Sequence, residues 1–268
     1  MFTESQAEGL LQKQKDFMLF PNVKPAIKVL YICRCCGKRQ VRLQCCGSMW
    51  CPVCNLKLSL KISSQFIRFS ILHKHLKKVF LTLTWKNIDK LEDDTFKNYR
   101  NDFTKKFLRN KIIKDKIYGG LYAFDYTINS VSGFYNFHLH CIVFLNEYIP
   151  QSVLSDVWLR ITKDSYVVDI RKINDIKNGI AEVMKYIQSN KLLLVSDEYK
   201  RQKLIDCISS IRRFSKFGKL YKEKLEKGIL KCGDCKSQMF DKIIYGENLY
   251  DIERGIEGEQ LLDYDYQS

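Results

Sequence analysis

Two histidines in an apolar stretch are the residues best suited to chemistry. His138 and His140 lie two positions apart within residues 137–144. The stretch is typical of a β-strand, in which alternate side chains share a face, so both imidazoles point the same way. Burying two imidazoles without partners is costly, and a shared divalent cation would remove that cost. A hydrogen-bonded polar patch is the alternative interpretation.

A carboxylate in the preceding predicted strand joins this pair. Residues 129–133 are typical of a turn, so the segments 120–128 and 134–145 are expected to form a hairpin. Six apolar residues match on one face of that hairpin: Tyr122, Phe124, Tyr126, Phe137, Leu139 and Cys141. This register places Asp125 opposite residue 137 or 138, beside the histidines on the other face. Two histidines and one carboxylate leave coordination positions open for a phosphate oxygen, and Asp169 is a weaker candidate for the carboxylate.

A tyrosine and a glutamate share one face of a predicted helix over residues 179–189. The apolar stripe of this helix is formed by Ile180, Val183, Met184 and Ile187. Glu182 and Tyr186 are four residues apart and therefore lie on the same face, opposite the apolar stripe. We expect Tyr186 to point outward with a carboxylate one turn away. A solvated amphipathic face is the alternative.

Paired cysteines predict a metal site. The chain has eleven cysteines, and seven of them lie between Cys33 and Cys54. Two C-x2-C pairs in this segment supply four thiolates, which suits tetrahedral zinc. The predicted structural zinc ligands are Cys33, Cys36, Cys51 and Cys54. Buried apolar thiols are the alternative, but they do not account for two such pairs.

Other cysteines leave the ligand set open. Three more lie in the same segment, namely Cys35, Cys45 and Cys46, and Cys46 is the first substitute. Cys232 and Cys235 form a further C-x2-C pair near the end of the chain. One pair cannot complete a tetrahedral site, so this pair stays unassigned.

Hydrophobic periodicity predicts the elements that position these residues. Strands are expected at residues 79–85, 120–128, 134–145 and 166–171, and helices at 62–76, 96–107, 153–161, 179–189 and 197–226. From residue 79 the order is β-α-β-β-α-β-α. This order predicts an α+β fold with an antiparallel sheet and helices on one face, the ferredoxin-like arrangement, preceded by a zinc-ribbon-like segment.

The predicted domains follow from this order. Residues 1–60 form an N-terminal segment with the cysteine-rich module, and residues 61–195 form the sheet domain. Residues 196–268 contain a basic helix, the second cysteine pair and an acidic tail.

Charge indicates the class of partner. Lys and Arg total 45 against 30 Asp and Glu, which gives a net charge of +15. From residue 241 onward there are eight acidic and two basic residues, so residues 1–240 carry about +21. A body this basic favours a polyanion such as nucleic acid.

The chain also lacks membrane and export signals. It has no apolar run of about 18 residues, so no membrane-spanning helix and no membrane partner are expected. Its first 20 residues include Glu4, Glu8 and Asp16 and no apolar signal core. Clustered cysteine pairs without such a signal favour metal binding in a reducing cytoplasm.

Taken in order along the chain, the motifs resemble those of plasmid rolling-circle replication initiators in the HUH endonuclease superfamily. The resemblance runs from about Cys33 to Lys191. It covers Cys46-x4-Cys51-Pro52-Val53-Cys54-Asn55, Phe80-Leu81-Thr82-Leu83-Thr84 with Asn87, Asp125-Tyr126-Thr127, His138-x-His140, Trp158, residues 167–172, and Glu182-x3-Tyr186.

The resemblance implies a single-strand DNA nickase and strand transferase with the HUH palm fold. His138 and His140 would be ligands of Mg²⁺ or Mn²⁺, and Tyr186 would be the nucleophile that forms a 5′-phosphotyrosyl link. Asp125 stands where the family often has Glu, and Asn136 stands where it often has a further His. The lysine that usually follows the tyrosine closely appears at Lys191.

The resemblance also implies the course of the reaction. The Glu182-x3-Tyr186 spacing implies hydrolytic termination, with Glu182 as the general base for water. The free 3′-OH would prime a host DNA polymerase, with a host helicase as a further partner. The substrate would be single-stranded or supercoiled DNA at a replication origin. The alternatives are a rolling-circle transposase of the same superfamily and a non-enzymatic zinc-ribbon protein that binds nucleic acid.

Overall fold

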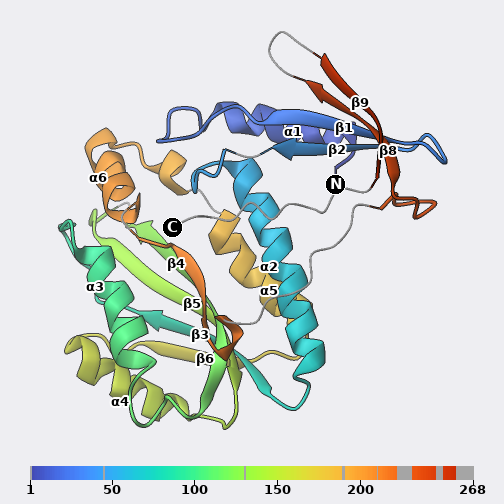
Figure 1. Ribbon diagram of the computed structural model, residues 1–268. Helices are drawn as coiled ribbons and strands as arrows, with labels where there is room; N and C mark the ends of the chain where they lie inside the picture. Colours follow the sequence, from blue (N-terminus) through green and yellow to red (C-terminus); the bar gives the residue numbers. More distant parts are fainter. Residues whose placement is uncertain are drawn as a thin grey trace. The chain divides into compact units, whose positions relative to one another are not determined.

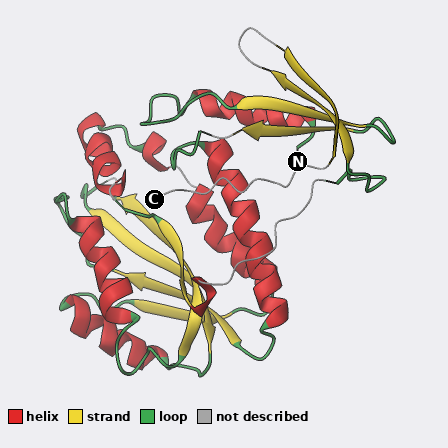
Figure 2. Ribbon diagram, in the orientation of Figure 1, coloured by secondary structure: helices red, strands yellow, loops and turns green. Residues whose placement is uncertain are grey.

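The computed structural model divides the chain into two units (Figure 1, Figure 2). It describes residues 2–44, 46–129, 131–188, 191–209, 211–221, 231–245 and 250–257. The first unit combines Met1–Leu60 with Lys224–Ser268, and the second is Lys61–Glu223. The two ends of the chain therefore belong to one unit, and the intervening segment forms the other.

The first unit contains a four-stranded antiparallel sheet of order β2-β1-β8-β9. Its strands are β1 (Ile27–Cys33), β2 (Arg39–Gln44), β8 (Met239–Tyr245) and β9 (Tyr250–Glu257), and its helices are α1 (Glu4–Lys15) and the start of α2 (Pro52–Leu72). The pairing of β1 with β8 sets Cys33 opposite Phe240. Both side chains are buried in one apolar cluster with Cys232. Chain segments about 200 residues apart thus share a core.

The second unit contains a five-stranded antiparallel sheet of order β6-β3-β5-β4-β7. The strands are β3 (Lys77–Thr84), β4 (Ile117–Ile128), β5 (Tyr135–Leu145), β6 (Val168–Lys172) and β7 (Phe214–Gly218). The helices are α3 (Thr95–Asn101), the π-helix η1 (Asp102–Phe107), α4 (Gln151–Thr162), α5 (Ile176–Gln188), η2 (Lys191–Leu194), α6 (Glu198–Ser209) and η3 (Lys219–Tyr221). The α+β class and the β-α-β-β-α-β order of β3 to β6 are confirmed.

Helices cover both faces of this sheet, so the prediction that they lie on one face is wrong. The Phe96 ring of α3 packs edge-on against Phe137, with ring centroids 4.9 Å apart. On the opposite face, the Tyr186 ring of α5 stacks on His140. The physical reason is that β4 and β5 are buried along nearly their whole length rather than at alternate residues. A strand that is apolar on both faces needs cover on both.

The hairpin of β4 and β5 has the predicted register. Asp125 is the direct partner of His138. The three predicted apolar pairs also form: Tyr122 with Cys141, Phe124 with Leu139, and Tyr126 with Phe137. Because partners in an antiparallel pair share a face, Asp125 and the two histidines lie on the face that α5 covers.

The predicted basic helix over residues 197–226 is wrong over residues 214–221, and residues 222–226 lie outside the described residues. Helix α6 ends at Ser209, and residues 214–218 form β7 on the edge of the sheet beside β4. The strand approaches β4 closely where Gly218 pairs with Gly119. Gly218 has φ of +65°, and a Cβ there would lie 2.5 Å from the Tyr118 carbonyl oxygen. The pairing of residues 214–218 with β4 and the close approach at Gly218 favour a strand over a helix here. Neither contact can be seen in the local hydrophobic periodicity.

The predicted domain of residues 196–268 is distributed over both units. Its part up to Glu223 belongs to the sheet unit, whereas the second cysteine pair belongs to the first unit. Much of the acidic tail, residues 258–268, lies outside the described residues, as do Cys45 and Ser189. In the part of the chain that the structure describes, no helix is long and apolar enough to span a bilayer.

Candidate active site and metal centres

The two histidines lie side by side in the middle of the second sheet, each held by a threonine of the neighbouring strand. Thr84 pairs with His138 and Thr82 with His140 across β3 and β5. The threonine hydroxyls are 3.0 Å from Nδ1 of His138 and 3.1 Å from Nδ1 of His140. With Nδ1 engaged on each ring, Nε2 is left to bind another group. A hydrogen bond on the remote nitrogen is the usual way in which a metal-binding imidazole is oriented.

Asp125 stands next to this pair. Its Oδ2 atom is 4.0 Å from Nε2 of His140, and its side chain is 9% exposed. The Lys191 Nζ atom donates a hydrogen bond to the same oxygen at 2.6 Å. The three predicted metal ligands therefore share one face, with a lysine neutralising the carboxylate.

Burial controls the charge of the histidines. It lowers the pKa of His138 and lowers that of His140 to about 4, with the negative charge of Asp125 acting in the opposite direction. Both rings are consequently neutral near pH 7. A neutral imidazole is the form that binds a metal ion, so the charge state and the donor set fit a divalent cation.

Tyr186 packs on the histidines instead of pointing outward, so that expectation is wrong. Its ring lies parallel to His140, with centroids 3.8 Å apart and planes 11° apart. The predicted apolar stripe of α5 is buried, and the tyrosine is half-buried beside it. A helical wheel places Tyr186 away from the stripe, but it does not show that His140 of β5 packs against that side of α5.

The phenol of Tyr186 donates a hydrogen bond to Glu182. The distance from its oxygen to Oε1 is 3.2 Å, and Lys185 Nζ lies 2.6 Å from Oε2. Burial raises the pKa of Tyr186 to about 12, and the charge of Glu182 acts in the same direction. The hydrogen bond from Lys185 lowers the pKa of Glu182. At neutral pH the site thus holds a protonated phenol against an ionised carboxylate.

These side chains line an open cleft of about 780 Å³. Its wall also includes Asp169, Arg171, Lys172 and Asn178 from β6 and the start of α5. Asp169, the weaker candidate for the metal ligand, lies on the same face but is paired with Arg171 at 2.6 Å. The cleft combines a nucleophile, a carboxylate, neutral imidazoles and cationic side chains, which is the set needed to act on a phosphodiester.

The structure divides the four predicted zinc ligands between two groups. Among the described residues, four sulfurs lie within 4.8 Å of one another: Cys33, Cys36, Cys232 and Cys235. The two closest approaches, Cys33 to Cys235 and Cys36 to Cys232, are both 3.5 Å. The second C-x2-C pair therefore partners the first, and Cys51 and Cys54 lie elsewhere.

Both halves of this four-cysteine group have the same backbone turn. Gly37 N donates to Cys33 O at 2.8 Å, and Lys236 N donates to Cys232 O at 3.2 Å. The residue after the second cysteine has a positive φ in each turn, +70° at Gly37 and +62° at Lys236. The repeated turn brings two pairs of thiols together at the end of β1 and the start of β8, in a number and arrangement that suit tetrahedral zinc.

A second group contains three cysteines, Cys46, Cys51 and Cys54. The Cys46 and Cys54 sulfurs are 3.6 Å apart. Gln14 Nε2 donates a hydrogen bond to the Cys51 sulfur at 3.1 Å. Cys46, the predicted substitute ligand, therefore joins the Cys51 pair, and Cys45 lies outside the described residues.

Three residues of the cleft were not assigned a role from the sequence. Thr82 and Thr84 orient the histidines, and Lys191 pairs with Asp125. The threonines alternate with leucines in a β-strand pattern, so the period of two could have placed both on one face. For Lys191 the family resemblance points to the residue but not to its partner, because the contact with Asp125 reaches back over 66 positions of sequence.

The family model and the curated relatives that match this chain are all replication proteins or proteins named "Protein rep". A family model described as a replication protein matches residues 37–267. "Protein rep" of Staphylococcus aureus is 29% identical over 160 residues, covering 53% of this chain and 68% of the relative. "Protein rep" of Streptococcus pneumoniae is 30% identical over 201 residues, covering 66% of this chain and 61% of the relative. A "Protein rep" of Lactiplantibacillus plantarum is 28% identical over 179 residues, covering 57% and 56%.

The aligned regions thus span between about half and two thirds of these relatives. No solved structure matches the chain closely.

Proposed function

Because the chain belongs to the replication protein family and its motifs resemble those of plasmid rolling-circle initiators, we propose that it starts rolling-circle replication by nicking one DNA strand at an origin. The observation that carries this proposal is the stacking of Tyr186 on the His140 ring, with the phenol hydrogen-bonded to Glu182. A phenol held against a metal-type histidine pair, in a cleft that also carries Arg171 and Lys172, suits covalent attack on a phosphodiester. The sheet with this site on it would be the palm of an HUH endonuclease.

His138, His140 and Asp125 would hold Mg²⁺ or Mn²⁺. The threonine contacts to Nδ1 leave Nε2 of each ring for the ion, and Asp125 would add a carboxylate oxygen. The bound cation would supply Lewis-acid activation of the scissile phosphate. Lys191, which neutralises Asp125 here, would keep the buried carboxylate paired until the ion binds.

Tyr186 would attack the scissile phosphorus. A bond forms between the phenol oxygen and phosphorus, the bond to the 3′ oxygen breaks, and the 3′ oxygen leaves as a hydroxyl after taking up a proton. The phenol proton passes to water in the open cleft, and water there supplies the proton that the 3′ oxygen takes up. Arg171 and Lys172 on the cleft wall would bind flanking phosphates. The free 3′-OH would prime a host polymerase, with a host helicase unwinding the duplex in the cytoplasm.

Glu182 would also end the reaction. After one round, a second cleavage must release the product without leaving a new covalent link. Glu182 lies within hydrogen-bonding distance of the phenol, so its carboxylate reaches the position of the linked phosphate. When replication regenerates the nick site in the cleft, Glu182 would accept a proton from water as the water attacks that second phosphate and the bond to its 3′ oxygen breaks. The freed 3′-OH would then attack the phosphotyrosyl phosphorus, and the Tyr186 oxygen would leave as a phenol that takes up the proton, which closes the product circle.

We also propose that Cys33, Cys36, Cys232 and Cys235 hold a structural zinc. The support is the closeness of the four sulfurs and the duplicated turn at each pair. This zinc would connect β1 to β8 and add binding free energy to the folding of the first unit.

The test is covalent attachment to DNA. Wild-type protein is incubated with a labelled single-stranded origin oligonucleotide and Mn²⁺, and adducts that resist denaturant are counted on a gel. Tyr186→Phe should form none while binding DNA as before, because only the nucleophilic oxygen is lost. Tyr199→Phe is the matched control, since Tyr199 is 79% exposed on α6, and it should form adducts normally.

Normal adduct formation by Tyr186→Phe would move the nucleophile elsewhere. Binding without any adduct in the wild type would favour a non-enzymatic DNA-binding protein. Joining of the adduct to unrelated target DNA would favour a transposase.

A further inference from the structure

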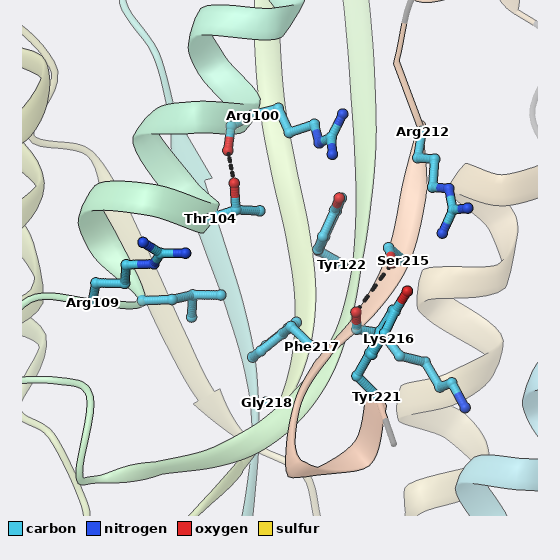
Figure 3. Close-up of a pocket in the computed structure, with 11 residues that line it drawn as sticks. Arg100, Thr104, Arg109, Tyr122, Arg212, Ser215, Lys216, Phe217, Gly218 and Tyr221 are labelled. Atoms are coloured by element: carbon cyan, nitrogen blue, oxygen red, sulfur yellow. Dashed lines mark hydrogen bonds between the residues drawn. The ribbon is translucent and has the colours of Figure 1, made fainter. Parts of the chain in front are cut away.

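A second cleft lies on the other face of the same sheet. Its floor includes Tyr122, which is three residues from Asp125 on β4 and therefore points to the opposite face. The cleft has a volume of about 600 Å³, and α3, η1 and β7 supply its walls (Figure 3). None of its eleven lining residues is acidic. The nicking site does not use this cleft.

Three guanidinium groups border the cleft. Arg100 ends α3, Arg109 follows η1, and Arg212 precedes β7. Within the described part of the chain, none of the three forms an ion pair with a carboxylate. Lys216 also lines the cleft, but its ammonium lies over the Phe69 ring, 5.7 Å from the ring centre. Cations gathered without acidic partners repel one another, and an anion between them would relieve that repulsion.

Arg100 lies close to the hydroxyl of Tyr122, and Arg212 lies on the β7 side of the same cleft (Figure 3). The Tyr122 side chain is 3% exposed, so its ring is covered and its hydroxyl faces the cleft. Burial raises the pKa of this phenol, while the positive charges of Arg100 and Arg212 act in the opposite direction. Guanidinium groups and a phenol proton that line one cleft make a donor set suited to phosphate oxygens.

The π-helix η1 contributes to this arrangement. In a continuous α-helix, a residue nine positions after Arg100 would be about 180° away around the axis. The Leu108 amide instead bonds to the Phe103 carbonyl, five residues back, at 3.0 Å. Arg109, two residues after this π-helix, lines the same cleft as Arg100. Helices of this kind are rare and often occur at functional sites.

We propose that this cleft binds backbone phosphates of single-stranded DNA at a distance from the scissile phosphate. The proposal rests on the DNA substrate proposed above and adds a second contact surface for it. The ligand chemistry is phosphate, which a free nucleotide would also offer. Tyr122 and Phe217 are only 3% and 6% exposed, whereas Tyr221 at the edge of the cleft is 57% exposed and offers a ring on which one base could stack. Several cations beside a single open ring suit the phosphates of a strand better than one nucleotide.

The test compares two double variants that remove the same charge. The cleft variant is Arg100→Gln with Arg212→Gln. The control is Lys105→Gln with Arg160→Gln, which removes two exposed cations of the same unit that do not line the cleft. Binding of a labelled single-stranded oligonucleotide is measured by fluorescence anisotropy over a range of salt concentrations. Circular dichroism checks the fold, and Arg212→Gln alone, in an exposed loop, serves as a second variant.

The cleft variant should raise the Kd at least tenfold. Its plot of log affinity against log salt should lose about 1.4 in slope, since each phosphate contact on a single strand contributes about 0.7. The control should change the Kd less than about twofold. Adduct yield at saturating DNA should be the same in all variants, because the cleft is remote from the chemistry.

Equal Kd values for the cleft variant and the control would overturn the proposal. So would loss of adenosine triphosphate or inorganic phosphate binding in the cleft variant with unchanged affinity for DNA, since the ligand would then be a free anion. A wild type that binds DNA but forms no adduct would refute the nicking function and leave the cleft result intact.

Discussion

Replacing either of two adjacent cysteines tests which of them binds the proposed zinc ion. The loss of a thiol is the same in both variants, but only one of them removes a ligand. Cys35 and Cys36 are both exposed on the turn after β1. Only Cys36 belongs to the four-sulfur group, in which its sulfur is 3.5 Å from that of Cys232. We expect Cys36→Ser to lose the zinc held there and Cys35→Ser to keep it.

The cost to stability follows from the length of chain that the metal closes. Cys36 and Cys232 are 196 positions apart. A cross-link that closes about 100 residues stabilises a fold by about 4.7 kcal/mol through the entropy of the unfolded chain. Doubling the loop adds about 0.6 kcal/mol, so about 5 kcal/mol is the expected upper value. At about 2–4 °C per kcal/mol for a chain of this size, the Tm should fall by about 10–20 °C.

The assay combines metal content with unfolding. Protein purified without chelator is denatured, and the released zinc is measured with a chromogenic chelator. Thermal unfolding is then followed for the wild type and both variants. Cys36→Ser should release about one zinc per chain less than Cys35→Ser and unfold at the lower temperature. If the two variants carry equal zinc and unfold together, the four-sulfur assignment is wrong.

Three further outcomes follow from contacts described above. Thr84→Val removes the hydrogen bond to Nδ1 of His138 and should weaken Mn²⁺ binding, so that adduct formation needs about 10–100-fold more Mn²⁺. An unchanged Mn²⁺ titration would contradict that role. Glu182→Gln should still nick, but monomer circles should give way to concatemers on a gel, and clean termination would exclude it as the base. Gly218→Ala should destabilise the protein by more than about 1 kcal/mol, measured as a lower Tm, because its φ is +65° and a Cβ would meet the Tyr118 carbonyl. Gly9→Ala, which meets nothing within 4 Å, should not lower the Tm.

The hairpin that carries the histidines could be predicted from the sequence because its constraint is local. The turn between β4 and β5 is short, and aromatic residues occupy alternate positions on both strands. A shift of one residue would move all of them to the other face. Asp125 therefore had to lie near His138, and the structure gives that pairing.

The partners of Cys33 and Cys36 could not be predicted from the sequence. Reasoning from motif spacing favours the C-x2-C pair that is nearest in sequence over one that is far away. The Cys51 pair lies near Cys36 in sequence, whereas Cys232 is 196 positions away. Only the pairing of β1 with β8 brings the distant pair to Cys33 and Cys36. Such a pairing depends on the whole fold, and no local pattern in either segment specifies it.

The same reason explains the errors in the helices. Residues 214–218 have a mixed basic and aromatic sequence, and pairing with β4 decides that they form a strand. Tyr186 lies off the apolar stripe of α5, yet the histidine face of the sheet extends beneath it. In both cases the deciding neighbour is far away in sequence, so tertiary contact overrides local preference.

In the sequence, the second unit is inserted between the two segments that form the first unit. This order determines which parts of the protein can assemble first during synthesis on the ribosome. Cys33 and Cys36 emerge early, but their partner thiols follow only after the whole second unit has been made. With 196 positions between Cys36 and Cys232 and translation at about 5–20 residues per second, the first pair waits about 10–40 s. During that interval β1 also lacks β8, its neighbour in the sheet. The sheet of the second unit can therefore fold before the first unit closes, and the arrival of Cys235 completes the four-thiol group proposed to hold zinc.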